Sequence, residues 1–137
     1  MKKRTRFGMH KLVRDKILER FEKADIPTAW KKLSLEEHIS ALKDKLVEEA
    51  QEVVEADNLD DLAHEIADVK EVLDVLTAKV NIAKEQLEKI QRKKAEERGS
   101  LEQGLYIEYV DIAYGTEWYD YCARDPKKYP IIENDIE

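Results

Sequence analysis

The chain has 137 residues, which is the length of one domain. Charged residues make up 40% of it and apolar residues 42%, with only 4 glycines and 3 prolines, a composition that suits amphipathic helices and disfavours a turn-rich β-sandwich. The net charge of -7 disfavours duplex nucleic acid as a partner, and no apolar run approaches the roughly 20 residues of a membrane helix. One cysteine and three histidines exclude an internal disulfide and a thiolate zinc site. We therefore expect an all-α, cytoplasmic protein in which any metal is held by carboxylates.

The first part of the chain predicts three helices. Residues 10–25 carry apolar side chains at helical spacings. Ser34-Leu-Glu-Glu37 is a capping box, in which a serine hydroxyl and a glutamate carboxylate satisfy free N–H groups, and it opens a helix that runs to about Ala56. The next helix is predicted from Leu59 to about Lys79. Because only a short turn separates these two helices, they should run antiparallel.

The last part of the chain changes in character. A fourth helix is predicted from Asn81, as its N-cap, to Arg98, with Gly99 as the left-handed residue after its end. Residues 105–112 favour extended structure, and residues 116–124 favour a short helix. All six tyrosines lie in the last 32 residues. We expect an antiparallel bundle of about four helices with an irregular, tyrosine-rich C-terminal tail.

Charge is strongly segregated along the chain. Residues 48–74 hold eleven acids and one base, Lys70, whereas residues 1–32 hold eleven bases and four acids. Residues 79–98 are again basic, with seven bases and four acids. A divalent cation would therefore be drawn to the middle of the chain and an anion to its flanks.

Four acids in the middle of the chain are candidates for a metal site. On a helical wheel of about 100° per residue, Glu49 falls at the edge of the apolar stripe of its helix, and Glu65 falls inside the stripe of the next one. Each is followed by a second acid three residues later, Glu52 and Asp68. A buried unpaired carboxylate costs several kcal/mol, whereas a bound cation would compensate its charge. Because an antiparallel hairpin brings the four carboxylates together, we predict a site for Mg²⁺, with Mn²⁺ as the alternative ion.

The simpler interpretation is a solvated acidic surface, since glutamates three residues apart are common on helices rich in Glu and Lys. Several acids of the region fit that interpretation, namely Glu55, Asp60, Asp61 and Glu71. A structural helix, however, usually interleaves bases four residues on, as Glu85–Lys89 and Glu88–Arg92 do in the fourth predicted helix. Residues 48–74 lack such bases, which favours the metal site.

Three segments carry a family resemblance, KLVRDKI at 11–17, KLVEEAQEVVEA at 45–56 and LAHEIADVKEVLDVL at 62–76. Together they resemble the MazG-type all-α NTP pyrophosphohydrolase superfamily, especially its small single-domain members related to phosphoribosyl-ATP pyrophosphohydrolase. The mark of that family is E-x-x-E followed after a gap by E-x-x-D. RKKAEERG at 92–99 also resembles the stretch after the last helix of the small members. The resemblance implies a helical domain over 9–99 and an N-terminal extension over 1–8. It does not cover residues 100–137, a tail whose aromatic side chains we expect to pack on the bundle or on a partner subunit.

The resemblance also implies an activity. Family members hydrolyse nucleoside triphosphates between the α- and β-phosphates, releasing a monophosphate and pyrophosphate, with Mg²⁺ on the motif acids. Carried over by position, the metal ligands are Glu49, Glu52, Glu65 and Asp68. Glu48, beside the ligand Glu49, is the nearby acid expected to orient or deprotonate water, so these two are the catalytic candidates. Phosphate contacts are expected from Lys11, Arg14, Lys16, Lys94 and Arg98. The alternative for Arg14 is a pair with a motif acid, or with the neighbours of Asp15, that holds the first helix against the hairpin. The family resemblance implies at least a homodimer with active sites near the interface.

Other interpretations stay open beside this one. An acidic helical interaction or regulatory module would keep the bundle without catalysis and without metal. Phosphoribosyl-ATP is a further candidate substrate, although residues 69–71 read Val-Lys-Glu where the histidine-pathway enzymes carry a Tyr-His pair. A di-iron bundle needs Glu-x-x-His, and none of the three histidines is preceded by such a glutamate. His64 stands where many relatives carry an acid and is expected to be a partly exposed helix residue, and the tail aromatics Tyr106, Tyr109 and Trp118 either stack on a base or pack on protein.

Overall fold

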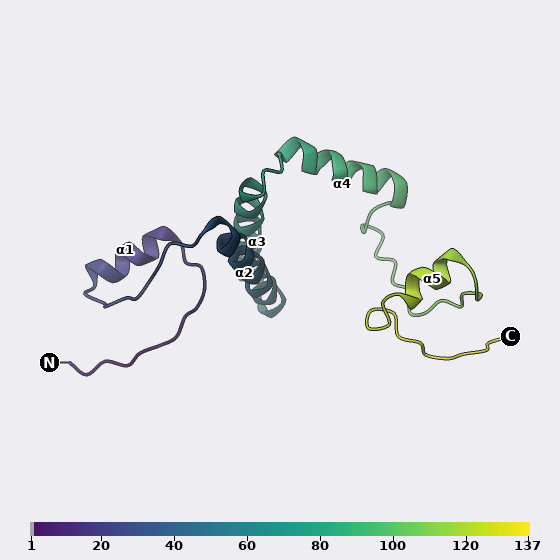
Figure 1. Ribbon diagram of the computed structural model, residues 1–137, viewed down its shortest axis with the longest axis horizontal. Helices are drawn as coiled ribbons and strands as arrows, with labels where there is room; N and C mark the ends of the chain where they lie inside the picture. Colours follow the sequence, from purple (N-terminus) through teal and green to yellow (C-terminus); the bar gives the residue numbers. More distant parts are fainter. Residues whose placement is uncertain (1) are drawn as a thin grey trace. The chain divides into compact units, whose positions relative to one another are not determined.

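The computed structural model describes residues 2–137 and is all-helical, which confirms the predicted fold class. Its helices are α1 (Asp15–Lys23), α2 (Leu35–Glu55), α3 (Leu59–Lys79), α4 (Lys84–Arg98) and α5 (Glu117–Ala123), coloured in chain order in Figure 1. The chain divides into two compact units, one up to Glu96 and the other Glu97–Glu137. Within residues 2–137, no helix has the length and apolar character needed to cross a membrane.

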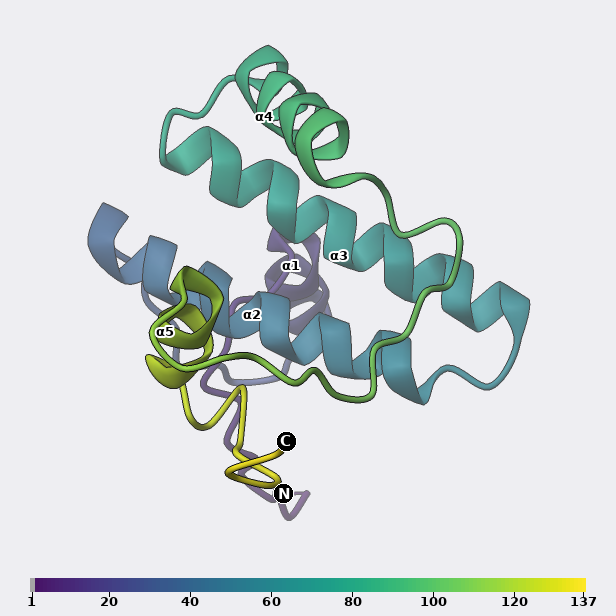
Figure 2. The same ribbon diagram turned by 90° about the vertical axis from the view of Figure 1, so that its right-hand side faces the viewer.

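Helices α2 and α3 form the antiparallel hairpin on which the candidate site is built (Figure 2). Ser34 begins α2, because its hydroxyl accepts a hydrogen bond from the Glu37 N–H while the Glu37 carboxylate accepts one from the Ser34 N–H. This reciprocal pair confirms the predicted capping box. Asn58 begins α3 by accepting from the Asp61 N–H. Both helix starts are therefore held by side-chain caps, each typically contributing about 1 kcal/mol.

The ends of α1 and α3 are closed by the same backbone motif. Asp25 and Asn81 lie in the left-handed region, with φ of 53° and 58°. In each case the N–H of the following isoleucine returns to a carbonyl in the last turn of the helix, Ile26 to Phe21 and Ile82 to Thr77, both at 2.9 Å. The prediction that Asn81 caps the start of α4 is therefore wrong, since its backbone completes α3 and α4 begins at Lys84. Gly99, at φ 81°, follows α4 as predicted.

Helix α1 begins later than the predicted start at residue 10. Residues 11–14 do not belong to the helix, and Arg14, at φ -65° and ψ 141°, is extended. The helix begins at Asp15, an acid in the first turn, where negative charge is favoured by the helix dipole. The apolar spacing of residues 10–25 could not reveal this, because the bases of residues 11–14 form ion pairs with distant acids instead of continuing the helix.

The hairpin buries few apolar side chains. Among the described residues, only Leu42 of α2 and Val72 of α3 are buried apolar residues. Besides Leu35 at the start of α2, five large apolar side chains of the same two helices are exposed, and we call these five the apolar face: Val47, Val54, Leu59, Ile66 and Leu73. These side chains recur every seven residues on each helix. With a helical step of about 100° per residue, they lie on the opposite side of the α2–α3 contact from Glu49, Glu52, Glu65 and Asp68. Each helix thus carries apolar residues over a wider part of its surface than the part that packs against the other helix.

The C-terminal unit is built around α5. Thr116 begins this helix by accepting from the Tyr119 N–H, which confirms the predicted helix over 116–124. Aromatic rings contact one another around it, with centroids 4.9 Å apart for Tyr114 and Tyr119 and 5.8 Å apart for Tyr121 and Tyr129. The predicted extended stretch, residues 105–112, forms neither helix nor strand and is largely exposed.

Candidate metal centre

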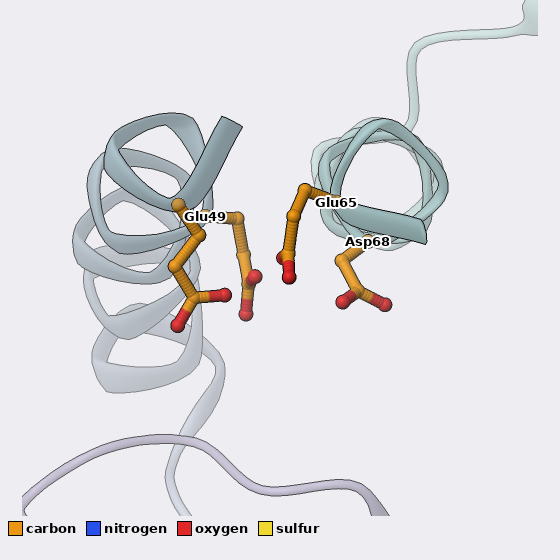
Figure 3. Close-up of side chains that lie close together, drawn as sticks. Glu49, Glu65 and Asp68 are labelled. Carbon is orange, nitrogen blue, oxygen red and sulfur yellow. The ribbon is translucent and has the colours of Figure 1, made fainter. Parts of the chain in front are cut away.

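Four acids converge on one point between α2 and α3. Glu49 and Glu52 come from α2, Glu65 and Asp68 come from α3, and one carboxylate oxygen of each lies within 4.8 Å of those of the others. We call these four residues the acidic cluster. Figure 3 shows Glu49, Glu65 and Asp68 pointing toward the same side of the hairpin. The i,i+3 spacing on each helix and the short link at residues 56–58 bring the two pairs opposite each other, as the sequence predicts.

Two oxygens of the cluster are buried without a hydrogen-bond partner. The Glu49 side chain is only 9% exposed. Its Oε2 and the Oε2 of Glu65 are inaccessible to water and accept no hydrogen bond from any described residue. An unsatisfied buried acceptor costs about 1–3 kcal/mol. Carboxylate oxygens held in this way fit a hard divalent cation, which prefers oxygen ligands.

The pKa of Glu49 is affected by its burial and by the neighbouring carboxylate of Glu52. Burial raises its pKa, and the neighbouring Glu52 carboxylate raises it further. The Lys45 ammonium acts in the opposite direction but does not cancel the increase. Glu49 is thus an acid whose charge is poorly compensated by the protein alone, and a bound cation would favour its ionised form.

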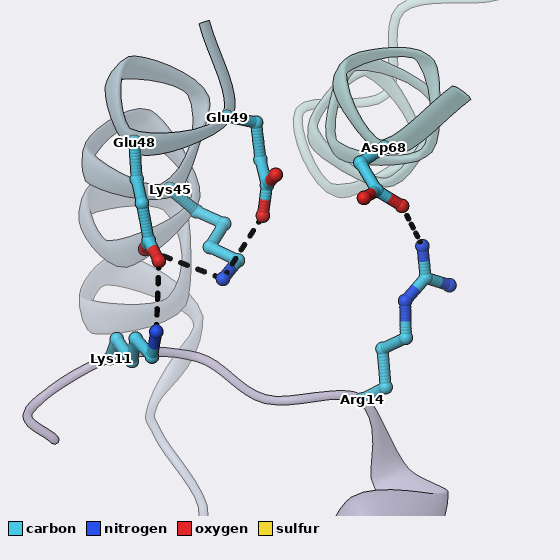
Figure 4. A network of polar contacts seen from close by, with 6 residues as sticks. All are labelled: Lys11, Arg14, Lys45, Glu48, Glu49 and Asp68. Atoms are coloured by element: carbon cyan, nitrogen blue, oxygen red, sulfur yellow. Dashed lines mark hydrogen bonds and ion pairs between the residues drawn. The ribbon is translucent and has the colours of Figure 1, made fainter. Parts of the chain in front are cut away.

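Two lysines contact the acids at the α2 side of the site. Lys45 Nζ lies 3.1 Å from Glu49 Oε1 and 3.3 Å from Glu48 Oε2, and Lys11 Nζ lies 2.9 Å from Glu48 Oε1 (Figure 4). The hydrogen bond from Lys11 is the main reason that the pKa of Glu48 is lowered. Lys45 is absent from the sequence-based set of site residues. The sequence does contain a signal for this contact, because a lysine four residues before a glutamate on a helix is placed to form an ion pair with it.

Arg14 contacts the acids at the α3 side. Its Nη2 donates a hydrogen bond of 2.8 Å to Asp68 Oδ1, and its Nη1 lies 4.0 Å from Glu71 Oε1. Arg14 and Lys11, which were expected to contact phosphate, are therefore both paired with acids in the structure. Glu71 was assigned to the solvated surface and does lie exposed at the edge of the site.

The other predicted site residues lie outside these ion pairs. Lys16 on α1 and Lys94 on α4 are exposed, and neither pairs with the acidic cluster among the described residues. Arg98 is the last residue of α4, in the C-terminal unit. His64 is exposed on α3, as predicted, with its Nδ1 2.8 Å from the Asp60 carbonyl oxygen.

Comparison of the chain with protein-family models, with curated proteins and with solved structures gives no match. The chemistry that the site can support follows from its own residues. Four carboxylates suit a hard divalent cation, and the bases beside them suit an anion that the cation also binds.

Proposed function

We propose that the protein is a Mg²⁺-dependent nucleoside triphosphate pyrophosphohydrolase of the MazG-type superfamily, which cleaves between the α- and β-phosphates to give a nucleoside monophosphate and pyrophosphate. The observation that carries this proposal is the pair of buried, unpartnered oxygens, Glu49 Oε2 and Glu65 Oε2, inside the acidic cluster. A purely structural or interaction module gains nothing from such oxygens, because they destabilise the hairpin unless a cation binds them.

The acidic cluster supplies the proposed ligands, with Mn²⁺ as the alternative ion. Bound there, the cation would offset the charge that develops on the polyphosphate and help to hold the attacking water. The carboxylates arise from two helices with capped starts that pack against each other, so the four acids already converge without a ligand. This convergence supports the assignment of the cluster as the catalytic centre.

Glu48 is the proposed water-orienting acid beside the ligand Glu49. Its side chain is partly exposed, so water can reach it. Lys11 and Lys45 keep its pKa low, so it is ionised at neutral pH and can accept a hydrogen bond from water. A lowered pKa also makes it a weak base, which favours orientation of the water over full removal of its proton. The proton of the attacking water then leaves to solvent or to the pyrophosphate product.

The bases flanking the cluster are the proposed phosphate contacts. Lys11 and Arg14 already lie beside it, and Lys16 follows two residues after Arg14. An arginine can bind two phosphate oxygens at once, which makes Arg14 the strongest candidate. Lys94 and Arg98 remain proposed contacts from α4.

We further propose that the protein forms a homodimer. The exposed apolar side chains favour the apolar face as its interface, on the side away from the acidic cluster, and not the acid-bearing side near which the family resemblance implies it. A two-helix hairpin with two buried apolar residues has a small core, and Val54 and Leu59 of this face are 77% and 84% exposed. Two copies related by a two-fold axis would cover each other's apolar faces, because such an interface is self-complementary. The seven-residue spacing of the face suits packing against another helix pair.

The proposal is tested by screening the pure protein against a panel of NTPs and dNTPs with Mg²⁺ and identifying the products by chromatography. We expect pyrophosphate and a monophosphate, at a rate that Glu65→Gln reduces by at least about a hundredfold, as expected for loss of a group that stabilises the transition state. Asp60→Asn, which removes the same charge from an exposed position of α3, is the matched control. Absence of turnover with every nucleotide would favour the non-catalytic module, and release of orthophosphate would contradict cleavage between the α- and β-phosphates.

A further inference from the structure

Residues 11–14, which lead into α1, cross the acid side of the hairpin, and we call them the strap. Lys11 at one end of the strap binds α2 through Glu48, and Arg14 at the other end binds α3 through Asp68 (Figure 4). Three residues of extended chain span about 10 Å, which is close to the 8–10 Å that typically separates the axes of two packed helices. One extended segment therefore reaches both helices beside the acidic cluster.

The pair between Arg14 and Asp68 uses an oxygen of a proposed metal ligand. Asp68 Oδ1 accepts from Arg14 at 2.8 Å, and Asp68 is one of the four acids whose oxygens converge. A guanidinium and a cation both require the lone pairs of the same carboxylate, and their positive charges repel each other. The pair is also exposed, at 60% for Arg14 and 38% for Asp68, so it is weak enough for a divalent ion to replace it.

The same two strap bases are the best-placed groups for phosphate. Lys11 and Arg14 cannot hold an anion fully while their donors are directed at Glu48 and Asp68. A cation that takes over Asp68 would leave the Arg14 guanidinium with only the longer 4.0 Å contact to the exposed Glu71. Arg14 would then be available at the edge where the phosphates of a metal-bound polyphosphate would lie. The binding of cation and anion would thus be coupled through the strap.

We propose that Arg14 of the strap exchanges one partner for another. It pairs with Asp68 until a divalent cation binds the acidic cluster, and its release from Asp68 then allows it to contact phosphate. The inference rests on the proposed function, because it takes the cluster as the cation site and the strap as the phosphate site. Because the two equilibria are linked, the Arg14–Asp68 pair must weaken cation binding by the same free energy by which the bound cation weakens the pair.

The first test measures Mg²⁺ and Mn²⁺ affinity by calorimetry, without nucleotide, for the wild type, Arg14→Ala and Arg14→Gln. An exposed ion pair contributes up to about 1 kcal/mol, so we expect both variants to bind the cation about two- to fivefold more tightly. Arg20→Ala is the matched control, because Arg20 is an exposed arginine of α1 outside the ion pairs of the site, and it should change the affinity by less than either variant. Unchanged or weaker cation binding in the folded Arg14 variants overturns the exchange.

The second test measures the binding of tripolyphosphate in metal-free buffer. Asp68→Asn removes the charged partner of Arg14 at 2.8 Å without any cation and leaves only the 4.0 Å contact to Glu71. We therefore expect this variant to bind tripolyphosphate about two- to fivefold more tightly than the wild type does. Asp60→Asn removes an equal charge from an exposed position of the same helix and controls for general repulsion. Equal affinities in the two variants overturn the exchange. A wild-type protein that binds no cation instead refutes the proposed function, so the two failures are distinguishable.

Discussion

Lys45 and Glu49, one turn apart on α2, form an ion pair of 3.1 Å in which the lysine side chain is 20% exposed and the glutamate 9%. Burial by itself lowers the pKa of Lys45, but its hydrogen bonds to Glu49 and Glu48 outweigh this and raise it overall. Lys45 is therefore a constant positive charge at the inner side of the acidic cluster. It engages one oxygen of Glu49 and leaves the other, Oε2, without a partner.

Replacing Lys45 by glutamine should destabilise the protein in metal-free buffer by about 1–3 kcal/mol, because Glu49 would lose its partner while staying buried. Urea denaturation followed by circular dichroism measures this change. Lys43→Gln, at an exposed position of the same helix, should have an effect within about 0.5 kcal/mol of zero. Equal stability of the two variants would show that the Lys45 pair does not compensate Glu49.

Mg²⁺ or Mn²⁺ should raise the melting temperature of the wild type, because a ligand that binds only the folded state stabilises it. Glu65→Gln should lose most of that increase, since it removes the charge from one of the two residues with a buried unpartnered oxygen. Thermal melts over a series of cation concentrations test this. A cation response in Glu65→Gln equal to that of Asp60→Asn would remove Glu65 from the set of ligands.

Arg14 and Asp68 form one ion pair, but substitutions of the two residues should change the enzyme kinetics in different ways. Arg14→Ala should raise KM for nucleotide or lower kcat by about tenfold or more, because it removes a charge-assisted contact of roughly 1.5–3 kcal/mol. Asp68→Asn should instead raise the Mg²⁺ concentration needed for half-maximal rate. Steady-state rates over a grid of nucleotide and Mg²⁺ concentrations separate the two effects, and unaltered kcat and KM in Arg14→Ala would place Arg14 outside the site.

The start of α2 should weaken in acid. The pKa of Glu37 is lowered from its ordinary value of 4.5, first because its carboxylate accepts from the Ser34 N–H and then through the Ser34 hydroxyl and Lys31. A folded-state pKa below the unfolded value contributes stability that is present above pH 4.5 and is lost as the pH falls through the folded value. Melting temperatures of the wild type and Glu37→Gln should therefore differ at pH 7 and converge as the pH falls through the lowered pKa of the folded state. Glu36→Gln, which removes the same charge from the adjacent exposed position, is the matched control.

Light scattering at micromolar concentration should give a species of at least twice the protomer mass of 16.0 kDa. Ile66→Lys places a charge in the middle of the apolar face and should return the protein to a monomer, while its exposed position leaves the hairpin intact. Asp60→Lys, outside that face, should keep the wild-type mass. A wild-type species of 16.0 kDa would refute assembly through the apolar face.

The features that were predictable from the sequence depend on near neighbours. The capping box at Ser34 and the left-handed Gly99 each involve residues within one helical turn, so local patterns suffice to identify them. The convergence of the four acids was also predictable, because a short link and regular helical spacing determine which side chains face each other. Glu65, a carboxylate on an apolar stripe, was the most informative residue.

The features that were not predictable depend on contacts between distant parts of the chain. A pair between Arg14 and a motif acid was an open alternative to the phosphate contact. However, Arg14 and Asp68 are 54 residues apart, and no local pattern indicates that residues 11–14 leave the helix to reach α2 and α3. The exposure of Val47 and Val54 was also not predictable. Helical spacing indicates which residues share an apolar stripe, but it does not indicate whether a neighbouring element covers that stripe. Asn81 was assigned to the wrong helix because asparagine is common both at N-caps and in the left-handed position after a helix.

The link at residues 56–58 also has a consequence for how the protein folds. All four acids of the cluster lie within twenty residues of sequence, and the helices that carry them are joined directly. Contacts that are short-range along the chain lose little loop-closure entropy, and helical proteins rich in them fold on the microsecond to millisecond scale. We expect the hairpin to form early, so that the carboxylates are already assembled when the strap, which is distant in sequence, closes over them. Cation added during refolding should therefore accelerate the first kinetic phase rather than the last.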